Sequence, residues 1–209
     1  MVNGIAIGTA SVNWGFDPLY TWVRTPSFAT MLDEMALSGY EGTEISYNFP
    51  ASAEQISQAL GQRHLKPAAT FHAVNLRTPA SYAAAEQSTI RVADRLDELG
   101  SDMLILSDKP SPERMAVAGR ASQVDALDES GWRSMSEGLN RLATLLARRE
   151  MHAVFHPHVG TYVETADEIE RCFGLDQHPM VGTVAHGCLL SPGRLLVLRF
   201  EPGLRFIGS

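Results

Sequence analysis

MHAVFHPHVGTYVE (151–164) places a polar segment directly after a short apolar run. The apolar residues 151–155 predict a buried strand. Pro157 cannot donate a hydrogen bond to a sheet ladder, so we expect the strand to end near it. Residues two apart in a strand point to the same face, so His156 and His158 can converge on one ligand. Imidazole is a common metal ligand and an effective acid or base near neutral pH, so a metal-assisted or acid–base site is predicted. A solvent-exposed loop that happens to carry histidines is the alternative.

The bulk composition is that of an ordinary globular protein. The chain has 209 residues, of which 44% are hydrophobic and 20% charged, enough for one substantial core. The formal charge of −7 argues against nucleic acid or an anionic membrane as the main partner. No apolar stretch approaches the roughly 20 residues of a spanning helix, and the N-terminus lacks the features of a signal peptide. Cys172 and Cys188 have no metal-binding spacing, which indicates reduced thiols in a cytoplasmic protein.

Apolar runs alternate with amphipathic segments along the chain. The predicted strands are 4–9, a turn and strand in 39–45, 66–76, 102–106 and 151–155, with weaker candidates at 180–185 and 204–207. The predicted helices are 26–38 with Thr25 as N-cap, 52–64, 81–99, 132–149 and one that a capping box at Thr165 opens, while 107–130 is loop-like with room for a short helix. This alternation implies a parallel sheet, either doubly wound or closed as a barrel. The Rossmann and Walker glycine patterns are absent.

Polar or aromatic residues recur after nearly every predicted strand. They are Asn13 and Trp14, Glu44 with Tyr47 and Asn48, His72 with Asn75, Ser107-Asp108-Lys109, His156 with His158, and His186. A (β/α)8 barrel builds its site from the C-terminal ends of many strands, so this recurrence favours the barrel. We therefore expect one α/β domain over 1–209, a TIM-barrel-like fold with about six or seven of the eight strands.

Four segments carry a resemblance to a known family. They are NWGFDP (13–18), SGYEGTEI (38–45), FHAVNL (71–76) and, most specifically, HPHVGTYVETADEIERCF (156–173). In these the chain resembles the xylose isomerase-like TIM-barrel superfamily of sugar isomerases, epimerases and inosose dehydratases, and most of all its inosose dehydratase-like branch. The resemblance implies a divalent metal (manganese, cobalt or magnesium) at the top of the barrel. Such a metal polarises a sugar or cyclitol oxygen while acids and bases move a proton on the neighbouring carbon.

The resemblance also implies roles for individual residues. His156 matches a metal-ligand position, and His186 would be a second surviving ligand. Glu44 matches a carboxylate that faces the site, and His158 lies beside His156, so both are expected to act as acid–base or substrate-orienting groups. Glu164 is a candidate for a direct catalytic role, with a helix-start acidic residue as its alternative.

Four further residues are expected to contact the substrate: Asn13, Trp14, His72 and Lys109. Trp14 would provide an apolar wall for a sugar ring or else plug the mouth of the barrel. His72 would line the site or be a hydrogen-bonded core histidine. Lys109 would contact the substrate or lie in a solvated loop.

The family pattern is lost after about residue 175. The sixth strand reads VGTVAH (181–186), which keeps a histidine but lacks the usual aspartate, and no eighth strand follows. An open barrel exposes a strand edge, which a homodimer would cover. The leading hypothesis is a metal-dependent isomerase, epimerase or dehydratase that acts on a sugar, inosose or related polyol. The alternative is a non-catalytic barrel remnant that binds a small polyol or a partner protein. The acidic charge argues against a DNA-repair nuclease.

Overall fold

The computed structural model describes residues 6–16 and 24–175. The start of the first predicted strand, the two weaker candidate strands and His186 lie outside the described residues. Within the described ranges, no helix is long and apolar enough to span a membrane.

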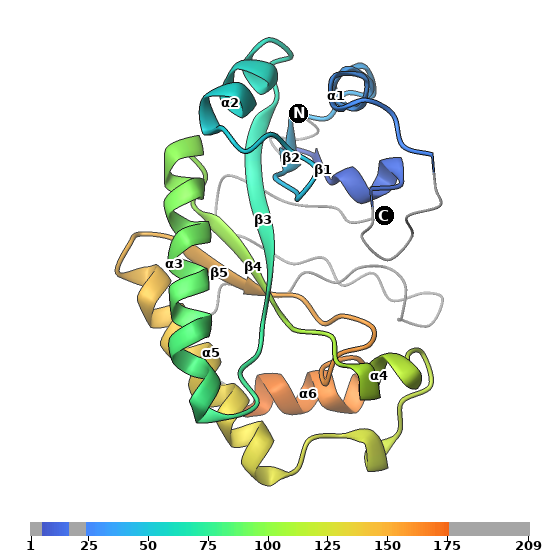
Figure 1. Cartoon of the computed structure of the whole chain (residues 1–209), viewed down its shortest axis with the longest axis vertical. Coiled ribbons are helices and arrows are strands. Elements are labelled where there is room, and N and C mark those ends of the chain that lie inside the picture. The colour runs from blue at the N-terminus through green and yellow to red at the C-terminus, as the bar shows by residue number, and fades with distance from the viewer. Residues whose placement is uncertain (1–5, 17–23, 176–209) are drawn as a thin grey trace.

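The described residues form a parallel sheet of five strands in sequential order (Figure 1). The strands are β1 (Gly8–Thr9), β2 (Gly42–Glu44), β3 (Lys66–Val74), β4 (Met103–Asp108) and β5 (His152–Phe155). Each strand pairs in parallel with its neighbour in the sequence, and a bulge between Thr43 and Glu44 shifts the register against β3. The predicted alternation of strands and helices is therefore confirmed.

Helices connect these strands. They are α1 (Phe28–Leu37), α2 (Ala53–Gly61), α3 (Tyr82–Leu99), α4 (Pro112–Ala116), α5 (Glu129–Ala147) and α6 (Ala166–Leu175), with 3-10 turns η1 (Ser11–Trp14), η2 (Pro79–Ser81) and η3 (Gln123–Asp125). The predicted N-cap of α1 was wrong. Ser27, not Thr25, caps the helix, because its Oγ accepts a hydrogen bond from the Thr30 N–H at 3.1 Å. The capping box before α6 is confirmed, since Glu168 and Thr165 each accept from the other's backbone N–H.

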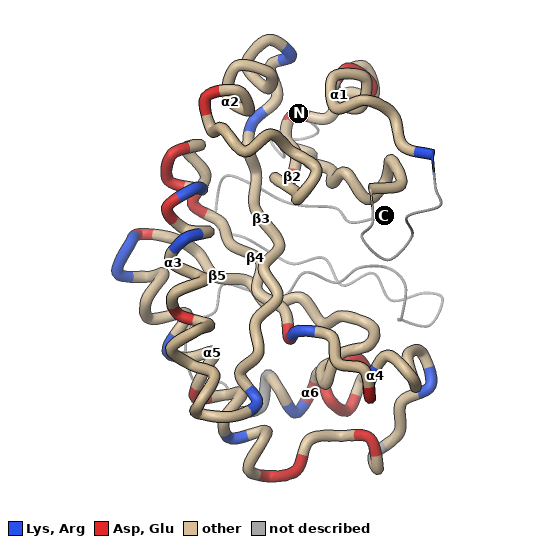
Figure 2. The backbone as a smooth tube through the Cα atoms, viewed as in Figure 1, with Lys and Arg blue, Asp and Glu red and all other residues tan. Residues whose placement is uncertain are grey.

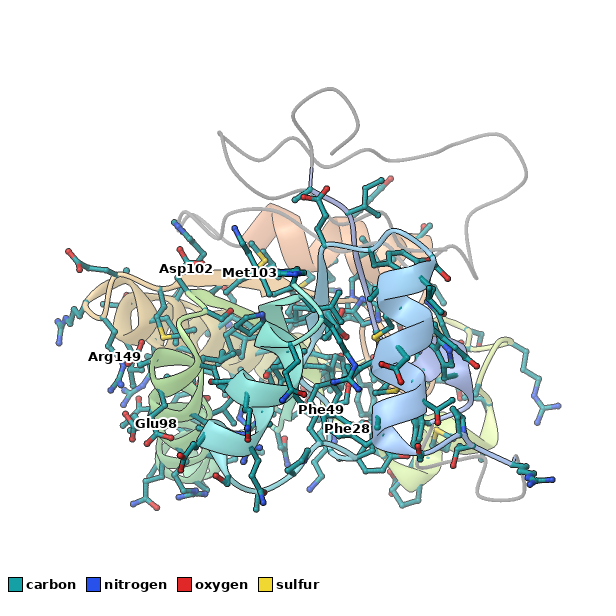
Figure 3. All side chains as sticks on the ribbon, turned by 90° about the horizontal axis from the view of Figure 1, so that it is seen from above. Phe28, Phe49, Glu98, Asp102, Met103 and Arg149 are labelled. Carbon is teal, nitrogen blue, oxygen red and sulfur yellow. The ribbon has the colours of Figure 1, made fainter. Side chains whose placement is uncertain are left out.

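One face of the sheet packs against the helices. Leu104 and Leu106 of β4 and Phe155 of β5 belong to one core cluster with residues of α3 and α5. Figure 1 shows these two helices side by side along the sheet, and Figure 2 shows that charged residues gather on the helices and loops rather than along β3 to β5. A second cluster packs Ile45 against α1 and α2, and within it the rings of Phe28 and Phe49 meet edge to face at 4.9 Å between centroids (Figure 3).

The opposite face carries a separate small cluster: Ala69, Met103, Ile105 and Val154. These residues alternate along β3, β4 and β5 with the residues that face the helices, so they line the inner face of the curved sheet. Sequential strand order with helices on one face is the winding of a barrel, whereas a doubly wound sheet reverses its order and has helices on both faces. Within the described residues β1 and β5 each pair on one side only. The homodimer that would cover such an edge stays a prediction.

Candidate functional site

His156 and His158 come together at the end of β5. His156 lies two residues beyond Val154 and so shares its inner face. Its backbone N–H donates to the Leu106 carbonyl at 2.7 Å and carries the ladder one step past the strand. The two imidazole centroids are 5.6 Å apart, with His156 buried and His158 partly exposed. This is the convergence that the sequence predicts.

The surroundings of His158 fix which ring nitrogen carries its proton. Nδ1 lies 2.8 Å from the Val159 carbonyl oxygen. A carbonyl oxygen only accepts, so Nδ1 donates, and the neutral imidazole presents the lone pair of Nε2. The same turn is held by a hydrogen bond from the His158 N–H to the Val163 carbonyl at 3.1 Å and from the Thr161 hydroxyl to the His158 carbonyl at 2.7 Å. His158 is therefore set up as a base or ligand through Nε2.

Phe71 of β3 completes an aromatic group with the two histidines. It pairs with Ile105 and so lies on the inner face, where its ring centroid is 5.8 Å from that of His156 and 5.9 Å from that of His158. It is 40% exposed although it lies inside a nine-residue strand. The sequence interpretation missed Phe71 and chose His72. The strand period places these neighbours on opposite faces, so only one of them can line the site.

Glu44 also lies on the inner face. It pairs with Ala69, while the next residue, Ile45, packs into the helix-facing core. No hydrogen bond or ion pair of its side chain is found within the described part of the chain. Burial raises the pKa of Glu44 from 4.5 to about 7. A carboxyl group with such a pKa can take up or release a proton near neutral pH.

The described residues supply only part of a metal-binding set. Nowhere in 6–16 and 24–175 do three or more His, Cys, Asp or Glu side chains gather closely enough to hold a metal ion. His156 is the predicted ligand within the described residues, and His186, the other predicted ligand, lies outside them. Zinc sites in proteins use three or four protein ligands, so His156 and His158 by themselves do not make such a site.

His72 and Trp14 lie on the helix-facing side. The Ser88 hydroxyl donates to the Ala85 carbonyl at 2.9 Å, so His72 Nε2 donates to Ser88 Oγ at 3.1 Å. Burial lowers the pKa of His72, and the positive charge of Arg91 adds to this. Trp14 Nε1 donates to Glu34 Oε2 at 2.6 Å, and its ring meets that of Tyr40. The structure brings neither residue to the histidine pair: His72 is hydrogen-bonded to α3, and Trp14 is hydrogen-bonded to α1.

Asn13 and Lys109 are not brought to the pair either. Asn13 Nδ2 donates to the Thr9 hydroxyl at 3.0 Å. The Lys109 side chain is exposed, while its backbone N–H donates to the Val74 carbonyl at 2.9 Å and its carbonyl accepts from Arg77. The Lys109 side chain thus lies at the surface, directly after β4.

Glu164 is buried in the loop after β5 and has partners at both oxygens. Oε1 accepts from the Gly119 N–H at 2.5 Å and Oε2 from the Gly160 N–H at 2.7 Å. Arg114 lies 3.8 Å from Oε2. This placement makes Glu164 a brace between two loops rather than a group that faces a substrate.

Arg114 is the centre of that brace, and the sequence interpretation missed it. Its guanidinium donates to the Thr161 carbonyl at 2.6 Å, the Asp125 carbonyl at 3.1 Å and Glu168 Oε2 at 2.9 Å, and the residue is 1% exposed. Arginine is almost never fully buried unless its charge is paired. A basic residue in a polar segment gives no signal of such burial.

A second ion pair, between the partly exposed Arg77 and the buried Asp108, adjoins the first. Asp108 Oδ2 accepts from Arg77 Nη2 at 3.1 Å and from the Tyr162 N–H at 2.9 Å. Burial raises the pKa of Asp108, although the Arg77 charge and the Tyr162 N–H act in the opposite direction. The Tyr162 ring lies between the Arg77 and Arg114 guanidinium groups, at 4.7 and 5.3 Å from its centroid. The loops that follow β3, β4 and β5 are thus tied together behind the histidine pair.

A hollow of about 680 Å³ lies elsewhere, between α3 and α5 on the outer helix layer. Its lining includes Ile90, Asn140 and Arg148 but none of the inner-face residues. It is remote from the imidazoles, so we locate the candidate site at the inner face.

Solved structures show the class of fold to which the described residues belong. A xylose isomerase-like TIM barrel/4-hydroxyphenylpyruvate dioxygenase fusion protein matches with a TM-score of 0.64 and 16% identity, over 86% of this chain and 26% of that one. The IolI protein with a bound zinc atom matches with a TM-score of 0.60 and 12% identity, over 86% and 62%. The described residues thus have the fold of part of a TIM barrel, as predicted.

Curated relatives are more specific. An inosose dehydratase of Clostridium perfringens is 27% identical over 180 residues, which is 86% of this chain and 60% of that protein. An inosose dehydratase of Clostridium botulinum is 29% identical over 178 residues, or 85% and 59%. The chain spans about 60% of the length of these relatives. No protein-family model matches the chain. The predicted resemblance to inosose dehydratases is confirmed.

Proposed function

We propose that the chain contributes the site of an isomerase, epimerase or dehydratase that removes a proton next to the carbonyl of a sugar, inosose or related polyol. The single observation that carries the proposal is the inner-face pair His156 and His158, 5.6 Å apart, in a chain similar to inosose dehydratases. All three reaction types begin with the same proton abstraction, so one site geometry serves each of them.

In this proposal Glu44 and His158 exchange protons with the substrate. A pKa of about 7 leaves Glu44 divided between its acid and base forms at neutral pH, which is the condition for efficient proton transfer. His158 presents Nε2 because Nδ1 is engaged with the Val159 carbonyl. Phe71 and His156 complete the wall between them. Asn13, Trp14, His72, Lys109 and Glu164 are left out because the structure gives them other partners or surroundings.

Metal dependence is a separate part of the proposal. The IolI structure holds a zinc atom, and His156 is the described residue that we propose as a ligand here. A bound divalent ion would polarise the substrate carbonyl and stabilise the developing negative charge. The other ligands would come from outside the described residues, where the predicted ligand His186 lies.

The first test is hydrogen exchange at the substrate carbon. The protein is incubated in D2O with inosose and with ketose sugars, with and without manganese, cobalt or magnesium, and deuterium incorporation is followed by NMR. Exchange next to the carbonyl is expected, and Glu44→Gln and His158→Ala should each slow it about 100-fold or more. His72→Ala is the matched control and should leave the rate unchanged. Absence of exchange in the wild type with every substrate and metal would refute the catalytic proposal.

Metal content tests the cofactor independently of catalysis. We expect about one divalent ion per chain after dialysis, and its loss in His156→Ala but not in His72→Ala. A wild-type protein that retains no metal after manganese or cobalt is added back would refute metal dependence alone.

A non-catalytic barrel remnant that binds a polyol or a partner protein is the second candidate. One observation favours it: the residues that the structure describes, 6–16 and 24–175, hold no group of three metal ligands. Saturable binding of inosose without exchange at its carbon would favour this reading over the enzyme.

A further inference from the structure

Phe71 is the most exposed apolar side chain of β3 to β5, and it lies where a ligand of the proposed site would lie. Phe71 is 40% exposed, whereas Ile105 beside it and Val154 on β5 are buried. A partly exposed aromatic ring inside a sheet leaves apolar surface that a ligand can cover. The ring centroids of His156 and His158 lie 5.8 and 5.9 Å from that of Phe71.

The register places Phe71 between the two polar parts of the site. Glu44 on β2 pairs with Ala69, two residues before Phe71 on the same face of the adjacent strand. The histidines lie on the other side, beyond β4. With neighbouring strands about 4.8 Å apart, β2 and β5 are roughly 14 Å apart along the sheet. A small ligand that reaches toward both sides therefore has to lie over the Phe71 ring.

We propose that Phe71 is a specificity-determining residue: its ring is the platform for one face of a ring-shaped polyol, whose polar edges point toward Glu44 and toward the histidines. The inference rests on the proposed function for the position of the ligand. A closed six-membered ring with hydroxyl groups at its edge has C–H faces that pack flat on an aromatic ring. An open-chain polyol has no such face. Phe71 thus selects cyclic over open-chain ligands, a role that the sequence interpretation gave to Trp14.

The test compares two ligands by isothermal titration calorimetry: inosose, a cyclic ketone, and sorbitol, an open-chain hexitol. We expect the wild type to bind inosose at least about tenfold more tightly. Phe71→Leu, which keeps an apolar side chain but loses the flat face, should weaken inosose binding about tenfold and leave sorbitol unchanged. Phe71→Tyr, which keeps the ring, should retain the preference. Ile90→Ala is the control, since Ile90 is 37% exposed on the outer helix α3.

Three outcomes would overturn the inference: equal affinity of the wild type for both ligands, an unchanged preference in a folded Phe71→Leu, or no binding of inosose by the wild type. Circular dichroism establishes that each variant is folded, and Phe71→Tyr supplies a conservative variant if Phe71→Leu is not. The result is separable from the proposed function. Preference that depends on Phe71 without hydrogen exchange at the substrate would refute the enzyme and support the platform. If Phe71→Leu keeps both the hydrogen exchange and the preference for inosose, the enzyme is supported and the platform is refuted.

Discussion

Polar side chains on the inner face of the sheet and polar side chains behind the sheet differ in how far their hydrogen bonds are used within the fold. Behind the sheet and in the loop brace, His72, Trp14, Glu164 and Arg114 each have hydrogen-bond partners on neighbouring elements. On the inner face, Glu44 has a raised pKa and His158 presents Nε2 beside an exposed aromatic ring. Polar groups whose bonds are used within the fold stabilise it. Groups on the inner face that keep hydrogen-bonding capacity are the ones that can act on a ligand, and the following predictions test that division.

The largest effect is expected in the loop brace. Arg114→Met leaves Glu168 and Glu164 buried without their cation, so the free energy of unfolding should fall by about 3–5 kcal/mol. Arg141→Met is the control, because its pair with Glu86 is at the surface and should cost about 0–1 kcal/mol. Urea unfolding of both variants measures the difference. Equal losses would show that burial does not distinguish the two pairs.

Glu44 should make stability depend on pH. Its pKa is raised from 4.5 to about 7, so between these values the unfolded state loses the proton that the folded state keeps. The contribution of Glu44 to the free energy of unfolding is therefore largest below pH 4.5. It falls as the pH rises and levels off above about pH 7. Glu44→Gln should remove about 1–3 kcal/mol of that fall. Urea unfolding from pH 4 to 8 measures it, with Glu54→Gln on α2 as an exposed control. Matching pH profiles in wild type and Glu44→Gln would contradict the prediction.

Two histidine variants should separate stability from binding. His72→Ala removes a partly buried hydrogen bond and should lower the free energy of unfolding by about 1 kcal/mol, with inosose affinity unchanged. His158→Ala should change stability by less than about 0.5 kcal/mol and weaken inosose binding. Thermal unfolding and calorimetry on the same samples give both quantities. The division between the faces fails if the two variants have the opposite effects.

The smallest effect concerns one proton. Nitrogen-15 NMR of the histidine side chains should show His158 with a protonated Nδ1 and an unprotonated Nε2 in its neutral form, since the Val159 carbonyl accepts from Nδ1. His152, exposed at the start of β5, provides the comparison within the same spectrum. A neutral His158 that carries its proton on Nε2 would mean that the base or ligand nitrogen is assigned wrongly.

Much of the fold could be predicted from local sequence. Gly100 ends α3 with a φ of +76°, Ser52 caps α2, and the capping box at Thr165 opens α6 where it was expected. These signals act within one turn of chain, so they need no tertiary contact. The α1 cap was misplaced because Thr25 and Ser27 both have capping side chains, and only the packed helix shows which hydroxyl is used.

The candidate site was predictable only in part. The His-x-His spacing placed His156 and His158 on one face, because strand periodicity is a property of the chain alone. The same periodicity also separates Phe71 from His72, but it does not say which of them faces inward. That depends on which face of β3 the helix α3 covers.

By itself, the sequence of this protein determined the alternation of strands and helices, the resemblance to inosose dehydratases and the convergence of the two imidazoles. Each of these follows from periodicity, turn chemistry or motif within one segment. The tertiary structure alone decided that Phe71 packs beside the imidazoles and that His72 and Trp14 form hydrogen bonds with α3 and α1. It also decided that Glu164 pairs with Arg114 in the loop brace. The physical reason is that these roles depend on burial and on partners that are distant in the sequence. The partner of His72 is 16 residues away, that of Trp14 is 20 residues away, and Arg114 and Glu164 are 50 residues apart. No local pattern encodes such contacts.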